Sequence, residues 1–100
     1  MEYQIESVIS HPGEILKEEF LNEMGISVYA LSKAISVPRS RINDIVLGRR
    51  SITADTAVRL GYFFDTDPQS WINLQSYYDV VMTKATIDMS MVKTAHEIRV

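Results

Sequence analysis

The stretch from residue 39 to residue 47 carries polar side chains at helical spacing opposite a narrow apolar stripe. Arginine can donate two hydrogen bonds to a guanine edge, asparagine can pair with adenine, and aspartate can accept from cytosine. A helix fits the major groove of DNA, and side chains in its first two turns reach the base edges. The polar side therefore predicts base contacts by four residues: Arg39, Ser40, Asn43 and Asp44. The alternative interpretation is a solvated helix face whose arginines pair with nearby acidic residues.

A second set of residues has the chemistry for phosphate contacts, which position a protein on DNA without reading its sequence. Arginine binds phosphate through charge and hydrogen bonds, and a hydroxyl at a helix N-terminus lies beside amide groups that attract anions. The set comprises Ser27, Arg41, Arg49, Arg50 and Thr53. For Arg49 and Arg50 a second role is open, because cations at the end of a helix also stabilise its dipole.

Two short helices separated by a tight break are needed to position these side chains. Residues 28–35 repeat apolar side chains every three or four positions, with Ser27 as the expected N-cap. Pro38 ends the break, since proline is tolerated as a first helical residue but not inside a helix. The second helix, 39–47, is expected to stop at Gly48. Its predicted buried side chains are Ile42 and Ile45, with Leu47 beside them. Such a pair is typical of helix-turn-helix proteins.

Three further amphipathic segments complete an all-α, five-helix pattern. They are expected over residues 12–24, from a cap at Thr53 or Asp55 to residue 64, and from residue 68, capped by Asp67, towards residue 84. The last of them is predicted to bury Trp71, Leu74 and Tyr78. The chain is therefore expected to have an extended N-terminal arm (1–11), a helix-turn-helix domain (12–84) and a C-terminal tail (85–100). In the tail, Ile87, Met89 and Met91 alternate as in a strand.

Basic side chains are concentrated in the middle of the chain, although its net charge is −3. Residues 27–59 carry six basic side chains against two acidic ones, a net charge of +4. Residues 1–26 have a net charge of −5, and residues 60–100 have −2. A positive centre between acidic flanks favours a polyanionic partner, with chance asymmetry in a small protein as the alternative.

The composition argues against several other classes of protein. The absence of cysteine excludes disulfides and thiolate metal sites, and the two histidines are too isolated to indicate a metal site. No apolar run approaches the roughly 20 residues that span a bilayer, and the acidic N-terminus lacks the features of a signal peptide. We therefore expect a cytoplasmic protein with no membrane segment. No nucleophile–base pair, phosphate-binding glycine loop or carboxylate cluster is present, so we expect neither enzymatic activity nor a cofactor.

Three blocks in fixed order resemble one protein family: HPGEILKEEFL, ALSKAISVPRSRINDIVLGRRSITADTAVRLGYFF and DPQSWINLQSYYD. They are similar to the HigA-type antitoxins, a branch of the lambda-repressor-like (Xre) helix-turn-helix proteins. The resemblance implies a five-helix DNA-binding domain, homodimerisation and binding of double-stranded DNA at an operator in the protein's own promoter. It also implies neutralisation of a HigB-type toxin, a small protein that cleaves messenger RNA on ribosomes.

Three features depart from the family pattern. Val28 stands where many relatives have glutamine, and Ser36 replaces the glycine common in the turn, which predicts a looser or differently shaped turn. The tail after Lys84 lies outside the pattern. Two alternatives therefore stay open: a stand-alone helix-turn-helix transcriptional regulator without a toxin partner, and a protein-interaction module with a degenerate DNA face.

Two surfaces are candidates for protein contacts. Tyr77 must face away from the side that its neighbour Tyr78 is expected to bury, and homodimers commonly bury such aromatic residues. The apolar residues of the tail have no obvious place in a five-helix core. The predicted dimer interface comprises Tyr77, Val81, Ile87 and Met89. The acidic side of the 12–24 helix is either a docking face for a basic partner or a solvated surface.

Overall fold

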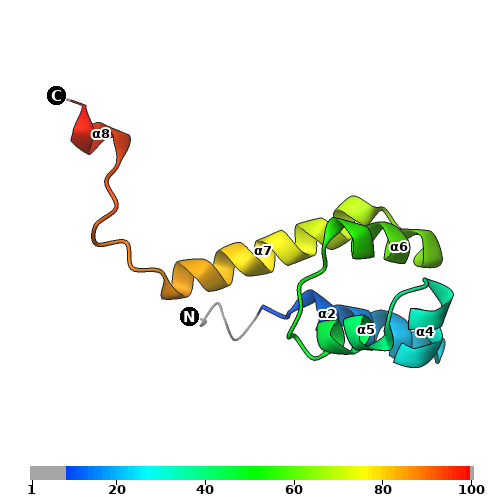
Figure 1. Ribbon diagram of the computed structural model, residues 1–100. Helices are drawn as coiled ribbons and strands as arrows, with labels where there is room; N and C mark the ends of the chain where they lie inside the picture. The colour runs from blue at the N-terminus through cyan, green and yellow to red at the C-terminus, as the bar shows by residue number, and fades with distance from the viewer. Residues whose placement is uncertain (1–8, 100) are drawn as a thin grey trace.

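The computed structural model describes residues 9–99, which form an all-α protein (Figure 1). The elements are α2 (Pro12–Ile15), η1 (Leu16–Leu21), α3 (Asn22–Met24), α4 (Val28–Ala34), α5 (Arg39–Val46), α6 (Ala54–Phe64), α7 (Pro68–Thr86) and α8 (Ala95–Ile98). The segments α2, η1 and α3 follow one another without a break and make one first helix. The five predicted helices are thus confirmed, and α8 is an additional short helix in the tail. Most of the expected N-terminal arm lies outside the described residues.

The first helix begins at a cap that the sequence analysis did not identify. Nδ1 of His11 accepts a hydrogen bond from the backbone N–H of Gly13 over 2.9 Å, and Pro12 occupies the first turn as expected. Gly25 ends the helix in the left-handed conformation, with φ at 67°. Both ends of the helix are therefore fixed by local chemistry.

Acidification is expected to weaken the His11 cap. Burial lowers the pKa of His11 below its usual value, against an opposing attraction from Asp79, and Nδ1 accepts a hydrogen bond only in the neutral ring. The stabilisation is therefore complete above the unfolded-state pKa of about 6.5. It is lost as the pH falls through the lower folded-state pKa. Thermal denaturation at about pH 7.5 and about pH 5.5 should show a larger loss for the wild type than for His11→Asn, whose amide caps without titrating. Equal losses would contradict the assignment.

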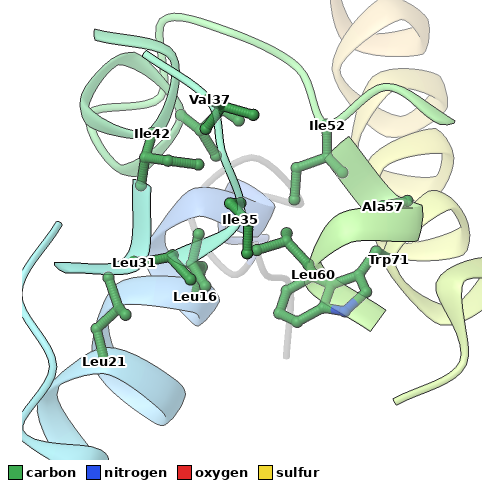
Figure 2. Packing of buried hydrophobic residues seen from close by; sticks show 11 residues of the cluster. Leu16, Leu21, Leu31, Ile35, Val37, Ile42, Ile52, Ala57, Leu60 and Trp71 are labelled. Carbon is green, nitrogen blue, oxygen red and sulfur yellow. The ribbon is translucent and has the colours of Figure 1, made fainter. Parts of the chain in front are cut away.

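The hydrophobic core collects side chains from all five predicted helices. Leu16, Leu31 and Leu60 converge from three of them (Figure 2). Beside them, the ring of Trp71 packs against that of Phe20, with the ring centroids 5.0 Å apart. This contact places α7 on the first helix, and the 2% exposure of Trp71 confirms its predicted burial.

Two predicted core positions are wrong. Leu47 is 56% exposed, because it follows the last residue of α5 and has left the apolar stripe of that helix. Leu74 is also exposed, whereas the neighbouring polar residue Gln75 is only 5% exposed. The inner face of α7 runs through Trp71, Gln75 and the half-buried Tyr78, and Leu74 lies at its edge.

The outer end of α7 and the tail extend away from the core (Figure 1), which gives the described chain dimensions of 58 × 31 × 22 Å. The alternating residues Ile87, Met89 and Met91 do not form a strand; they lie in an exposed, irregular segment before α8. Among the described residues, no helix has both the length and the apolar composition needed to span a membrane.

Candidate nucleic-acid interface

Helix α5 is held against the domain by apolar side chains and by one close backbone contact. Ile42 and Ile45 are completely buried. At the end of α5, a Cβ atom on Gly13 would overlap the backbone carbonyl group of Ile45. The start of the first helix and the end of α5 therefore touch directly, and only glycine permits this approach. This contact fixes which side of α5 faces outward.

The outward side of α5 carries the four residues that were predicted to contact bases. Arg39, Ser40 and Asn43 are exposed, and Asp44 is half-buried. Within the described residues, the guanidinium group of Arg39 has no ion-pair partner. The structure thus brings all four side chains onto one face of one helix and leaves the guanidinium group of Arg39 available to a ligand.

Asp44 faces the two arginines that follow α5. Its carboxylate oxygens lie 3.4 Å from Nη2 of Arg49 and 3.5 Å from Nη2 of Arg50. Exposed ion pairs of this length contribute little to stability. Both arginines can therefore leave Asp44 for a phosphate group at little cost. The alternative interpretation, in which the arginines of the α5 face pair with nearby acids, is met for Arg41, which pairs with Asp55, and not for Arg39 within the described residues.

The turn between α4 and α5 contains a residue in an unfavourable conformation. Ser36 has φ at 58°, in the left-handed region that suits glycine. Its carbonyl oxygen and that of Ile35 both accept hydrogen bonds from Nη1 of Arg59, over 3.4 Å and 2.7 Å respectively. The turn therefore keeps the conformation suited to glycine although the sequence supplies a serine.

Replacing Ser36 with glycine is expected to stabilise the protein by about 0.5–1 kcal/mol. A left-handed conformation costs a residue with a Cβ atom roughly 1–2 kcal/mol, and the greater freedom of glycine in the unfolded chain offsets part of this gain. Urea denaturation measures the difference. The matched control is Ser76→Gly, an exposed serine inside α7, which should lose about 0.5 kcal/mol. A loss at both positions would mean that Ser36 is not strained.

A hollow between α5, the following loop and the start of α6 gathers three of the predicted phosphate-binding residues. Its volume is about 360 Å³, and Arg41, Arg50 and Thr53 all line it. The hydroxyl of Thr53 also caps α6, since it accepts from the N–H of Thr56 over 3.5 Å. Ser27 is not among the residues that line this hollow. Its hydroxyl caps α4, since it accepts a hydrogen bond from the backbone N–H of Ala30 over 3.0 Å.

Asp55 also lines the hollow, although it is not among the residues that the sequence predicts for this site. One of its oxygens accepts from Nη1 of Arg41 over 2.7 Å and from Nε of Arg59 over 2.8 Å. Hydrogen bonds from Arg41 and then Arg59 lower the pKa of Asp55 below its usual value. Asp55 and Arg59 lie four residues apart on α6, a spacing that favours an ion pair and that was visible in the sequence.

The loop after α5 is anchored so that its two arginines stay at the surface. Ile52 is buried in the core, and its N–H donates to Oε1 of the buried Gln75 over 2.8 Å. Nε2 of Gln75 in turn donates to Asp79 over 2.9 Å. Because Arg49 and Arg50 precede this anchor, their exposed side chains are held beside the end of α5. Gln75 was missed because a buried amide has no periodicity signal of its own.

The arrangement matches known proteins. The helix-turn-helix family matches residues 16–71, more than half of the chain. Virulence-associated protein I of Dichelobacter nodosus is 57% identical to it over 74% of this chain and 68% of the relative. Antitoxin HigA-1 of Vibrio cholerae serotype O1 is 36% identical over 72% of this chain and 68% of that antitoxin.

A solved structure agrees with these sequence relatives. The structure of Pseudomonas aeruginosa antitoxin HigA with the higBA promoter has a TM-score of 0.76 and 51% identity, covering 77% of this chain and 84% of that one. Sequence and fold thus point to the same group, and the chain belongs to the helix-turn-helix family, in the branch that contains the HigA antitoxins.

Proposed function

We propose that this chain is a sequence-specific autorepressor that binds its own promoter and is also an antitoxin. The observation that carries the proposal is the exposed polar face of α5 beside the exposed Arg49 and Arg50. A buried inner face and a polar outer face suit a helix that enters the major groove. The proposal is supported by the HigA relative, whose structure was solved with promoter DNA.

The residues divide into two roles in this proposal. Base edges are read from α5, where the planar fork of Arg39 suits guanine and the amide of Asn43 suits adenine. The proposed base contacts are Arg39, Ser40, Asn43 and Asp44. Phosphate groups are held around the hollow, beside the end of α5 and at the N-terminus of α4. The proposed phosphate contacts are Ser27, Arg41, Arg49, Arg50 and Thr53.

Comparing Arg39→Ala with Arg49→Ala tests this division. Arg39→Ala is expected to cost about 1–3 kcal/mol on the operator and to relax preference at one base pair. Arg49→Ala should instead weaken binding to operator and scrambled duplexes alike, and reduce the log–log salt slope by about 0.9. Mobility shifts over a range of salt concentrations measure both effects. Unchanged operator affinity and preference in Arg39→Ala would reject the assignment of α5.

The partner of the antitoxin activity would be a basic, HigB-type toxin. The first helix presents four exposed carboxylates to such a partner: Glu14, Glu18, Glu19 and Glu23. An acidic face favours approach of a basic protein through long-range attraction. A short, strongly basic reading frame beside the gene would identify this partner. Its absence would favour the stand-alone regulator.

We also propose that two copies act together, in the cytoplasm, where promoter DNA is found. Each copy would present one α5 to one half-site of a two-fold operator. The proposed dimer interface comprises Tyr77, Val81, Ile87 and Met89. Of these, Tyr77, Ile87 and Met89 are large exposed apolar side chains, which favours their burial in an assembly.

A further inference from the structure

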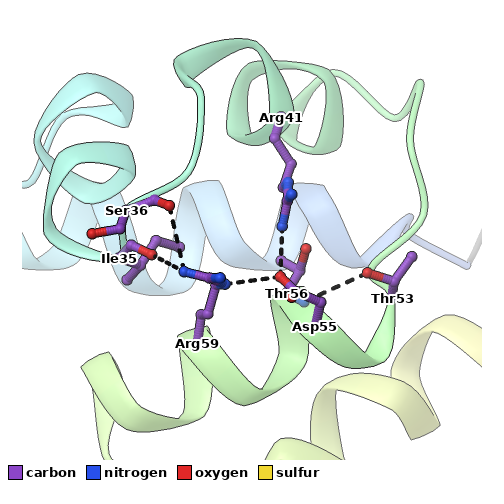
Figure 3. Close-up of polar contacts among 7 residues, drawn as sticks. All are labelled: Ile35, Ser36, Arg41, Thr53, Asp55, Thr56 and Arg59. Atoms are coloured by element: carbon purple, nitrogen blue, oxygen red, sulfur yellow. Dashed lines mark hydrogen bonds and ion pairs between the residues drawn. The ribbon is translucent and has the colours of Figure 1, made fainter.

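Arg59 joins three parts of the candidate interface. From α6, its Nη1 donates to the carbonyl oxygen of Ile35 over 2.7 Å and to that of Ser36 over 3.4 Å. Its Nε donates to Asp55, whose same oxygen accepts from Arg41 on α5. Figure 3 shows this continuous path from the turn, through Arg59 and Asp55, to α5.

The contacts at the turn compensate for a local defect. The last carbonyl groups of a helix lack partners within that helix, and the left-handed Ser36 follows the end of α4. Arg59 supplies a charged donor to this group of carbonyls, and charge-assisted hydrogen bonds are stronger than neutral ones. A guanidinium can hold a carbonyl and a carboxylate at once because its donors lie in a fixed plane. An ammonium group has no such planar fork.

The same network determines how Arg41 is presented. Arg41 lines the hollow for phosphate, but its guanidinium is paired with Asp55 at 2.7 Å. Arg59 shares that carboxylate, so the position of Asp55 depends on both arginines. Exposed ion pairs contribute little to stability by themselves. Their expected effect here is therefore on the orientation of α5 and of Arg41, more than on the free energy of unfolding.

We propose that Arg59 is a positioning residue for DNA recognition, which holds the turn and, through Asp55 and Arg41, sets the orientation in which α5 meets the bases. This inference rests on the proposed function, because it concerns preference for an operator over other DNA. Arg59 itself would not contact DNA: the donors that it directs to the turn and to Asp55 are engaged within the protein.

The test measures affinity for an operator duplex and for a scrambled duplex of equal length, over a range of salt concentrations. Arg59→Ala is expected to lower operator affinity about tenfold, within the range seen for mutations in coupled networks. Scrambled-duplex affinity should fall no further than in the control Lys33→Ala. That control removes one exposed positive charge on α4. The ammonium group of Lys33 lies over the ring of Tyr29. Arg59→Lys should not restore the preference, because the ammonium group cannot replace the fork.

Two results would overturn the inference. An unchanged ratio of operator to scrambled affinity would show that Arg59 positions nothing. Equal losses on both duplexes, with the salt slope reduced by about 0.9, would make Arg59 a phosphate contact.

Asp55→Ala keeps the inference testable if Arg59→Ala does not fold, since it breaks the same path at an exposed residue. This variant should lower the ratio while raising scrambled-duplex affinity, because it removes a negative charge beside the phosphate hollow. An unchanged ratio would again overturn the inference. A wild-type protein without any operator preference would instead reject the proposed function itself.

Discussion

Replacing Ile42 with alanine is expected to lower the free energy of unfolding by about 2–5 kcal/mol. Ile42 lies on the inner side of α5, and its side chain is completely buried. Truncation removes its apolar contacts and leaves a cavity that the surrounding residues fill only in part. Since domains of this kind are stable by about 5–15 kcal/mol, the loss is a large share of the total. Urea denaturation followed by circular dichroism measures it.

Leu47→Ala is the matched control for this substitution. Leu47 is an aliphatic residue directly after the same helix, but its side chain is exposed. Its truncation should cost less than about 0.5 kcal/mol, as is usual for surface positions. Similar losses for the two variants would mean that α5 is rotated relative to the core. Its outward face would then not carry the proposed base contacts.

The helices were predictable because their signals are local. The hydroxyl groups of Ser27 and Thr53 and the carboxylate of Asp67 each accept a hydrogen bond from the first turn of the helix they precede. Gly25 and Gly48 take the left-handed conformation expected of helix stops. Capping and turn chemistry depend on a few neighbouring residues, so one sequence suffices to identify them.

Contacts between distant segments were not predictable in this way. Gly13 reads as an ordinary residue of a first helical turn, and only the packing of α2 on α5 shows why a side chain does not fit there. Gln75 is polar, so apolar periodicity does not single it out, yet it holds the loop that carries Arg49 and Arg50. In both cases the partner lies far away in the sequence, so no periodicity within one helix reveals the pair.

The candidate interface depends both on local signals, which the sequence shows, and on contacts between distant segments, which it does not show. The face with Arg39 and Asn43 follows from the helical spacing of residues 39–46, and the structure places these residues as expected. The pairing of Asp55 with Arg41 depends on how α6 crosses beside α5, which the sequence does not specify. The sequence thus predicts which residues are candidates for DNA contact, and the structure adds Asp55 and Arg59, which we propose orient them.

We expect assembly to depend on the part of the chain that contributes least to the core. All described residues after Met82 are exposed. The large apolar side chains among them include Ile87, Met89, Met91 and Val92. A single basic surface is too small for tight specific binding, so two copies are expected on half-sites about 10 base pairs apart, or a multiple of that. Together with Tyr77 on α7, these exposed apolar residues are the surface most suited to pairing the copies.

Deleting residues 84–100 is expected to shift the protein towards monomer and to weaken operator binding more than it lowers the melting temperature. The deletion removes apolar surface that the core does not use, so its effect should fall on assembly. Deleting only residues 93–100 is the matched control, because it removes α8 and keeps the apolar segment from Ile87 to Val92; this protein should remain a dimer. Sedimentation equilibrium measures the assembly state, and mobility shifts on two-site and one-site operators measure its effect on binding. A dimer with normal operator affinity after the longer deletion would rule out the tail as a dimerisation element and leave Tyr77 and Val81 on α7 as the remaining candidates.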